Sequence, residues 1–321
     1  MLDSRLGRWL SCDAKLSKYP QWSPYHFGYC SPIVTIDNEG EENIVIVGSQ
    51  YDQNPGNKLS FMNQAISQID NYFKNEPNES RVVLLFTEGY TPDQIKEFTE
   101  EIKNRGGIVQ SVVTATAVTN YINSKKTYSG DVDEVRSSDK VTNVDAFAHG
   151  LPSSIEFGYK TDNADAARFG VTQSNSLKPE AFADGATFTS YACRTGASTD
   201  LLRYNPFNTP GDAKSESSLA QKMANSADIN VDAFISRTDY SGTLGTRMDR
   251  KLESLMNVGV GTKRTENYTA LHNFKAFQKQ TYDVDGGTFS PAGAYRPVTS
   301  SGTPINTIER KIFTPEKKPQ K

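Results

Sequence analysis

Asn43-Ile44-Val45-Ile46-Val47-Gly48 is a run of mostly β-branched residues closed by a glycine, and such a run is typical of a buried strand in a parallel sheet. Two comparable apolar runs follow at residues 81–86 and 108–113. Between the runs, apolar residues recur at helical spacing over residues 59–73, and residues 91–104 have the boundary residues of a helix. Strands that alternate with helices in this way predict right-handed crossovers, and therefore an α/β fold with a mostly parallel central sheet flanked by helices.

The same alternation continues along the chain to about residue 236. The segment 91–104 has clear helix boundaries, because Thr91 can cap it, Pro92 suits its first turn and two glycines end it. Ser218 and Gln221 have the spacing of a capping box at the start of another helix. We expect the remaining elements to be helices at 114–123 and 216–227, strands at 141–148, 187–192 and 231–236, and a polar loop at 124–140.

The composition describes a soluble, rather polar globular protein of 321 residues, with 36% hydrophobic residues and a mean hydropathy of −0.59. The apolar runs fall short of the roughly 20 residues that a membrane span needs, and the amino terminus lacks the apolar core of a signal peptide. The net charge is −3, and the lysines and arginines are scattered. Because nucleic-acid binders usually carry a basic stripe, we expect neither nucleic acid nor membrane as a partner.

The three cysteines, Cys12, Cys30 and Cys193, cannot form a closed set of disulfides. Neither they nor the three histidines have the spacing of metal ligands, so we predict no metal site and no cofactor. This cysteine usage suits a reducing compartment, in which a special cysteine is reactive rather than structural. We expect Cys12 and Cys30 to be packing residues, and we predict no role for His272.

Two of the predicted strands end in residues that can do chemistry. One ends in Asp145-Ala146-Phe147-Ala148-His149-Gly150 and the other in Thr189-Ser190-Tyr191-Ala192-Cys193-Arg194. In open α/β sheets, ligands bind at the carboxyl ends of the strands. If the two strands are neighbours, His149 and Cys193 face one substrate. A thiolate is a strong nucleophile, and an imidazole can take the proton of the thiol and later give one to a leaving amine.

Gly150 adds a second feature to this pair. A residue without a Cβ lets a backbone N–H approach a substrate closely. The amides of Gly150 and Cys193 are therefore the predicted oxyanion hole for a tetrahedral intermediate. Both side chains also have an ordinary alternative, since a histidine after a strand is often a cap or core residue and a lone cysteine is often a small buried hydrophobe.

The motif Ala192-Cys193-Arg194-Thr195-Gly196, with His149-Gly150 located 44 residues before Cys193, resembles the caspase-hemoglobinase group of cysteine peptidases, clan CD. The form Ala-Cys-Arg-Thr-Gly is closer to the CHAT-like bacterial branch, because Tyr191 replaces the glutamine of the caspase motif and Thr195 is inserted. Over residues 43 to about 240, the resemblance implies a caspase-like thiol protease, a hydrolase with His149 and Cys193 as its catalytic dyad.

The same resemblance implies where a substrate binds. In caspase-like enzymes the primary specificity pocket is lined by the loop after the strand that follows the catalytic cysteine, and by residues near the end of the first strand. Here those positions hold Arg237, Asp239 and Gln50, and Tyr191 is a further expected substrate contact. Arg237 would favour an acidic substrate side chain and Asp239 a basic one, and a plain salt bridge or turn role is the alternative for at least one of them. Glu156 is expected at the rim or in solvent.

The first forty residues resemble a different family, the carboxyl-terminal end of Rhs-repeat core domains. The matching segments are Leu2 to Ser11, Lys18-Tyr19-Pro20, Ser23-Pro24-Tyr25 and Ile36-Asp37-Asn38-Glu39-Gly40. In that family this end closes a large β-cocoon shell, and a variable toxin follows it, often after self-cleavage near an Asp-Pro motif. Here Asp13 precedes Ala14 and Asp37 precedes Asn38, so the motif for self-cleavage near Gly40 is incomplete.

Together the two resemblances imply three parts: an Rhs-core remnant at 1–42, a caspase-like peptidase domain at 43–282, and an extended, partly ordered tail at 283–321. They imply a secreted toxin or effector, exported as part of a larger Rhs protein, that cleaves proteins in the cytoplasm of a recipient cell. The expected partners are a protein or peptide substrate, a cognate immunity protein and the Rhs shell of the parent protein.

Two other functions fit the same α/β scaffold. One is a non-peptidase toxin enzyme, such as a nucleotide-directed or acyl-transfer enzyme, although no Gly-rich phosphate loop follows Val47. The other is a catalytically inactive binding module, which an unreactive Cys193 would favour.

Overall fold

The computed structural model of the chain describes residues 41–49, 59–130, 132–198, 213–235 and 310–316, together with the backbone of several two-residue strands elsewhere. The helices are α1 (Ser60–Asn75), α2 (Pro92–Asn104), α3 (Ala115–Ser124), α4 (Val171–Asn175) and α5 (Leu219–Ala227). The longer strands are β3 (Glu42–Val47), β4 (Ser80–Phe86), β5 (Ile108–Val112), β6 (Val141–Phe147), β7 (His149–Leu151), β8 (Ser154–Glu156), β10 (Phe182–Ser190), β11 (Asn230–Phe234) and β16 (Arg310–Phe313). The two-residue strands are β1 (Leu2–Asp3), β2 (Arg8–Trp9), β9 (Arg168–Phe169), β12 (Thr238–Asp239), β13 (Asp283–Val284), β14 (Gly287–Thr288) and β15 (Arg296–Pro297).

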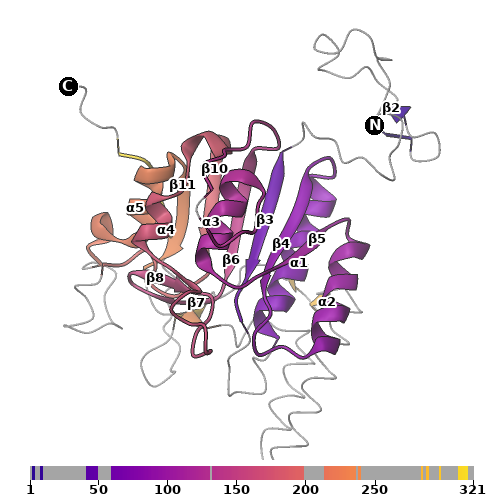
Figure 1. Cartoon of the computed structure of the whole chain (residues 1–321), viewed down its shortest axis with the longest axis horizontal. Helices are drawn as coiled ribbons and strands as arrows, with labels where there is room; N and C mark the ends of the chain where they lie inside the picture. Colours follow the sequence, from indigo (N-terminus) through magenta and orange to yellow (C-terminus); the bar gives the residue numbers. More distant parts are fainter. Residues whose placement is uncertain are drawn as a thin grey trace, which may run out of the picture.

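Among these, seven strands form one sheet in the order β16-β11-β10-β6-β3-β4-β5 (Figure 1). Every neighbouring pair is parallel except β16 and β11, which are antiparallel. All six residues of β3 are buried, as its sequence predicts for a strand covered on both faces. The predicted fold class is confirmed in its coarse form, an α/β protein with a mostly parallel central sheet flanked by helices.

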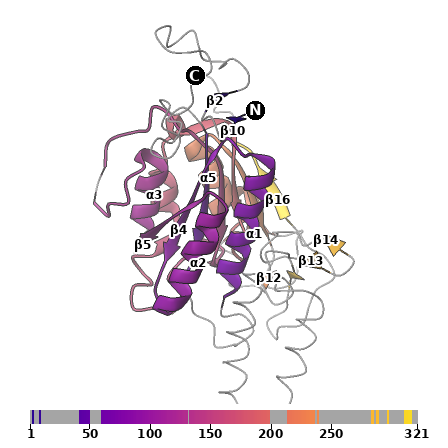
Figure 2. The same ribbon diagram turned by 90° about the vertical axis from the view of Figure 1, so that its right-hand side faces the viewer.

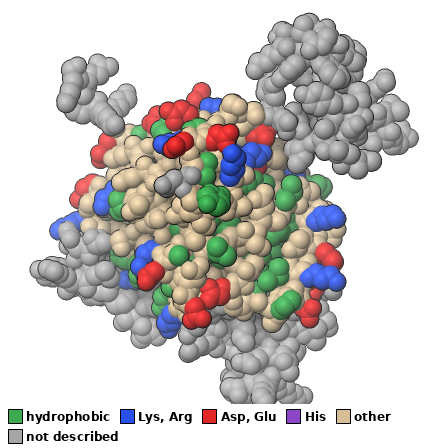
Figure 3. Space-filling view, viewed as in Figure 1, with side chains coloured by type: hydrophobic (Ala, Val, Ile, Leu, Met, Phe, Trp, Pro, Cys, Tyr) green, Lys and Arg blue, Asp and Glu red, His purple; other side chains and the backbone are tan. Residues whose placement is uncertain are grey.

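Helices cover both faces of the sheet (Figure 2). Because side chains alternate along a strand, Val45 and Val47 of β3 belong to the core under α1 and α2, whereas Ile44 and Ile46 belong to the core under α3 and α5. On the face that carries α3, charged side chains of both signs are spread around the outline of the coloured surface (Figure 3). This distribution matches the scattered lysines and arginines of the sequence.

The boundaries of α2 follow the predicted capping residues. Thr91 Oγ1 accepts a hydrogen bond from the amide of Gln94 at 3.3 Å, and Gln94 Oε1 accepts one from the amide of Thr91 at 2.9 Å. Pro92 is the first residue of the helix. Since this reciprocal pair satisfies two orphan amide groups, the helix start is fixed by local sequence.

Two parts of the fold were not predicted. Strands β7, β8 and β9 form a small antiparallel sheet. Residues 310–313, in the segment predicted to be an extended tail, form β16 and pair with β11, so the central sheet also uses residues beyond 282. Of residues 1–42, the structure describes the backbone of the β1–β2 pair and residues 41–42. Within the described part of the chain, no helix has both the length and the apolar character needed to cross a membrane.

Candidate active site

The predicted site lies at the carboxyl edge of the sheet, because β6 and β10 are parallel neighbours. Their pairing ends with Ala146 opposite Ser190, and the amide of Tyr191 donates to the carbonyl of Ala146 at 2.9 Å. His149 and Cys193 each follow that last pair by three residues. The structure therefore brings both predicted residues to one edge, on adjacent segments of chain.

Gly150, directly after His149, packs against the segment that carries Cys193. A Cβ built on Gly150 would lie 2.6 Å from the carbonyl oxygen of Cys193, 2.8 Å from its amide nitrogen and 2.7 Å from the Cβ of Ala192. Because a Cβ cannot approach other heavy atoms so closely, only glycine fits at this position. Gly150 is therefore needed for packing against the backbone of Cys193, which is a different reason from the close approach of a substrate that the sequence predicts.

The imidazole of His149 is half-buried and contacts two aromatic rings. The ring of Phe61, in the first turn of α1, meets it edge-on with 5.2 Å between centroids, and the ring of Tyr159 lies 4.6 Å away at 44°. Phe61 belongs to the core under α1, so His149 lies on the α1 side of the sheet edge. Aromatic contacts of this kind restrict the orientation of the imidazole.

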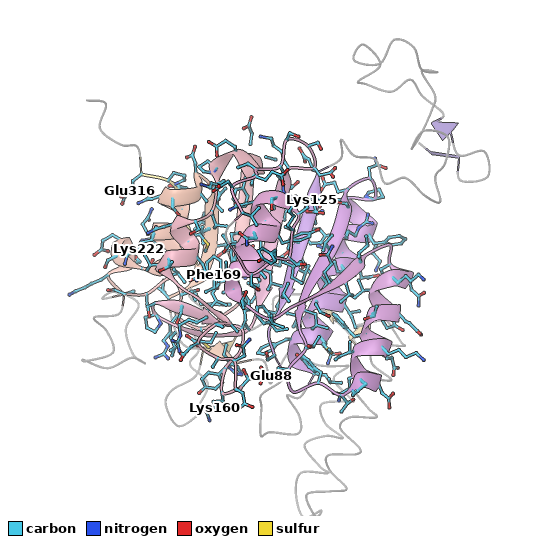
Figure 4. All side chains as sticks on the ribbon, viewed as in Figure 1. Glu88, Lys125, Lys160, Phe169, Lys222 and Glu316 are labelled. Carbon is cyan, nitrogen blue, oxygen red and sulfur yellow. The ribbon has the colours of Figure 1, made fainter. Side chains whose placement is uncertain are left out.

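The loop after β8 carries Tyr159, whose ring contacts the imidazole of His149. The amide of Asp162 in this loop donates to Oε1 of Glu88 at 2.9 Å, which ties the loop to the segment after β4. Glu88 and Lys160 are both labelled at this edge in Figure 4. The loop is therefore anchored to the same edge of the sheet as the candidate dyad.

Glu156 is only 3% exposed. It lies opposite His149 in the β7–β8 pairing and opposite Arg168 in the β8–β9 pairing. Its Oε1 accepts hydrogen bonds from Arg168 Nε at 2.9 Å and from the hydroxyl of Ser154. The expectation that Glu156 is solvated or on the rim is therefore wrong, because its carboxylate is buried and neutralised by an arginine.

Cys193 is a free cysteine of intermediate exposure, and it lies in a tight turn after β10. The next residue, Arg194, has a φ of 58°, in the left-handed region that residues other than glycine seldom adopt. The turn is fixed by the hydroxyl of Thr195, which lies 2.8 Å from that of Ser190, and by the amide of Gly196, which donates to the last carbonyl of β11 at 2.9 Å. Residues in sparsely populated backbone regions persist only where their surroundings hold them, and they cluster at functional sites.

Tyr191, predicted as a substrate contact, is 7% exposed and belongs to the core under α1. Its ring stacks on Phe147 with centroids 4.5 Å apart and planes 11° from parallel. The guanidinium carbon of Arg310 lies over the Tyr191 ring, 4.8 Å from its centroid. Burial raises the pKa of the Tyr191 hydroxyl well above its ordinary value. The structure thus gives this ring a packing role two residues before Cys193.

Asp145 lies on β6, four residues before His149, and is buried. Its Oδ2 accepts a hydrogen bond from the hydroxyl of Tyr72 in α1. Tyr72 is buried in the core under α1. Phe73, the last residue of the predicted helical pattern 59–73, is instead 47% exposed. Burial raises the pKa of Asp145 from 3.8 to about 6, while hydrogen bonds from Tyr72 and Gln68 oppose the rise. The core beside the site therefore contains a carboxyl that changes charge at mildly acidic pH.

The remaining predicted residues lie outside the described part of the chain, except that the backbone of Asp239 is described. Asp239 is described only as backbone in β12, where it pairs with Arg296 of β15. No group of three or more His, Cys, Asp or Glu side chains that could hold a metal ion occurs among the described residues. The residues outside the description are Gln50, Arg237, Cys12, Cys30 and His272.

Three residues near the site were not predicted: Phe61, Tyr159 and Arg310. The helical pattern after the first strand could have placed Phe61 near the carboxyl edge, because a crossover helix begins where its strand ends. Tyr159 and Arg310 have no such local signal, since their contacts come from segments distant in sequence.

Fold and site define an α/β protein in which a histidine and a cysteine follow two neighbouring parallel strands at the carboxyl edge of the sheet. Comparisons of the chain with protein-family models, with curated proteins and with solved structures found no match.

Proposed function

We propose that this chain is a caspase-like cysteine peptidase of the CHAT-like type, with His149 and Cys193 as its catalytic dyad. The observation that carries the proposal is the parallel pairing of β6 with β10. Each of the two residues follows the last paired residue of its strand by three positions, so both reach the same edge of the sheet. The packing of Gly150 against the backbone of Cys193 supports it, because this contact keeps the two turns adjacent. The mostly parallel sheet flanked by helices agrees with the fold that the resemblance implies.

In this mechanism His149 takes the proton of the Cys193 thiol, and the thiolate attacks the carbonyl carbon of a peptide bond. The carbonyl oxygen becomes an oxyanion that the amides of Gly150 and Cys193 stabilise. The tetrahedral intermediate then collapses and the C–N bond breaks, while His149 gives its proton to the leaving amine. Water, deprotonated by His149, hydrolyses the thioester that remains and restores the thiol.

Two local features support these roles. Phe61 and Tyr159 restrict the imidazole from both the helix side and the loop side. The turn through Arg194 is held by bonds from Thr195 and Gly196, so the nucleophile has a fixed backbone around it. A catalytic pair held by its surroundings loses less entropy on reaching the reactive geometry.

The toxin setting is the second part of the proposal and rests on the Rhs resemblance of residues 1–42. The chain enters the sheet at Glu42, at the amino end of β3, whereas His149 and Cys193 follow the carboxyl ends of β6 and β10. A shell joined at residue 42 would therefore lie at the opposite edge from the dyad. We expect an effector exported with the Rhs shell, which acts on cytoplasmic proteins of a recipient cell and is held in check by an immunity protein.

The test is cleavage of a peptide library by wild type, Cys193→Ala and His149→Ala. Wild type is expected to cleave a defined set of peptides, and each variant is expected to lose at least about a thousandfold in kcat while keeping its thermal midpoint. Cys12→Ala and Cys30→Ala are the matched controls and should keep full activity. A Cys193→Ala protein that cleaves as well as wild type would end the proposal.

A further inference from the structure

A row of four side chains crosses the sheet next to the candidate dyad. It consists of Arg310 of β16, Phe234 of β11, Tyr191 after β10 and Phe147 at the end of β6. The guanidinium carbon of Arg310 lies 4.8 Å from the centroid of the Tyr191 ring and 4.9 Å from that of Phe234. Tyr191 in turn stacks on Phe147, at 4.5 Å between centroids.

We propose that Arg310 is a positioning residue for Cys193 and acts through Tyr191. The role deepens the proposed peptidase function and rests on it. It assigns part of the site to the carboxyl-terminal strand, which lies 117 residues beyond the candidate nucleophile in the sequence.

Arg310 is itself held by Asp232 of the neighbouring strand. Its Nε donates to Oδ1 of Asp232 at 3.0 Å, and its Nη2 lies 2.7 Å from Oδ2. The side chains of Arg310 and Asp232 are 23% and 27% exposed, so water only partly screens the pair. One hydrogen bond from Nε and a close ion-pair contact of Nη2 to the same carboxylate restrict the orientation of the planar guanidinium, which lies over the Tyr191 ring.

The same strand also supports the other side of the nucleophile turn. Phe313 of β16 is 1% exposed, and a Cβ built on Gly196 would lie 3.0 Å from its Cζ. The turn through Cys193 runs from Tyr191 to Gly196. Arg310 of β16 lies against Tyr191, and Phe313 of the same strand lies against Gly196.

The position of Tyr191 explains how Arg310 can affect the thiol. The amide of Tyr191 still donates to β6, but the chain leaves the sheet immediately after it and turns through Cys193. The packing of the Tyr191 ring therefore fixes the direction in which the turn starts. Since a misplacement of about 1 Å can cost on the order of a hundredfold in rate, a small shift of this ring is enough to slow the reaction without unfolding the protein.

The experiment replaces Arg310 with methionine in the full chain, because methionine keeps an unbranched apolar stem and removes the guanidinium. Lys103→Met is the control, since Lys103 carries the same charge, is exposed and lies in the last turn of α2, at the amino edge of the sheet. Three quantities are measured: kcat and KM on a cleaved peptide, the rate at which iodoacetamide alkylates Cys193 in the folded protein, and the thermal midpoint.

We expect Arg310→Met to lower kcat by about tenfold to a hundredfold, with KM changed by less than about twofold. The alkylation rate of Cys193 should change by at least about threefold, because the thiol then occupies a different environment. Lys103→Met should leave all three quantities close to wild type. Arg310→Lys should give an intermediate kcat, since lysine keeps the charge but not the planar group.

A folded Arg310→Met protein with wild-type kcat and a wild-type alkylation rate overturns the positioning role, because a residue that only stabilises the fold moves the thermal midpoint alone. If Arg310→Met does not fold, Asp232→Asn makes the same test, since it loosens Arg310 without removing it. If wild type cleaves no peptide, the peptidase proposal fails by itself, and the alkylation rates then decide whether Arg310 positions the thiol.

Discussion

Gly150 packs directly against the backbone of Cys193, so closely that a Cβ on the glycine would lie 2.6 Å from the cysteine carbonyl oxygen. The contact joins the turn after β6 to the turn after β10. The nearness of the candidate base and nucleophile is therefore set by two backbones, which move less than flexible side chains do.

Gly150→Ala is expected to destabilise the protein by about 1 to 3 kcal/mol, because the added methyl must push the two turns apart. It should also abolish peptide cleavage, since the same movement separates His149 from Cys193. Urea unfolding and a peptide assay measure the two effects. Gly170→Ser is the control, because a Cβ there has its nearest neighbour at 3.7 Å and serine is a good helix cap. Wild-type activity in Gly150→Ala would contradict the close packing.

The Phe147–Tyr191 stack should appear as an energetic coupling. In a double-mutant cycle of Phe147→Leu and Tyr191→Leu, we expect a coupling free energy of about 0.5 to 1.5 kcal/mol, because stacked rings gain this much beyond area burial. Unfolding in urea measures all four proteins. The cycle between Phe147→Leu and Phe169→Leu should give a coupling near zero, since Phe147 and Phe169 lie in the cores on opposite faces of the sheet. Equal coupling in both cycles would argue against the stack.

Asp145 should make stability depend on pH. Its pKa rises from 3.8 to about 6 on folding, chiefly through burial, so the native state binds the proton more tightly than the unfolded state. The stabilisation from this proton is full below about pH 4 and is lost as the pH rises through 6. Relative to Asp145→Asn, wild type should therefore lose roughly 2 to 3 kcal/mol between pH 4 and pH 7.5. Urea midpoints at four pH values measure this, and a constant difference between the two proteins would refute it.

A buried ion pair at the amino edge should stabilise the start of β3. Arg136 Nη1 donates to Oε2 of Glu42 at 2.7 Å, with the side chains 2% and 1% exposed. Arg136→Met leaves the carboxylate without this partner and should cost roughly 3 to 5 kcal/mol in unfolding free energy. The double variant Glu42→Gln with Arg136→Met should recover part of that loss. Lys126→Met, which breaks the exposed pair with Glu134, should change stability by no more than about 1 kcal/mol.

Much of the fold was predictable because its signals are local. The β-branched run 43–48 defined a buried strand, and the residues from Thr91 onward defined the start of α2. The strand ends were less accurate, since β6 ends at Phe147 and β10 at Ser190, before residues 148 and 192 of the predicted strands. The strands end where the last hydrogen bond between them is made, from the amide of Tyr191 to the carbonyl of Ala146. That bond depends on which strand is the neighbour, and no local pattern reveals the neighbour.

The candidate site was predictable in its chemistry but not in its surroundings. A histidine and a cysteine after two strands were visible in the sequence, whereas Tyr159 against the imidazole and Arg310 over Tyr191 were not. Strand β16 is four residues long, and its exposed Lys311 and Ile312 give no sign of a sheet edge. Its pairing with β11 is a contact between distant segments, and only packing selects it.

The sequence by itself determined which segments are strands and helices and which residue types stand at their ends, because hydrophobic period, capping and side-chain chemistry act over a few neighbouring residues. The tertiary structure alone decided that β6 lies beside β10, that Gly150 meets the backbone of Cys193, and that β16 packs against the turn through Cys193. Strand order and edge pairing depend on how whole layers bury their apolar faces against each other, and that free energy belongs to no single stretch of the chain.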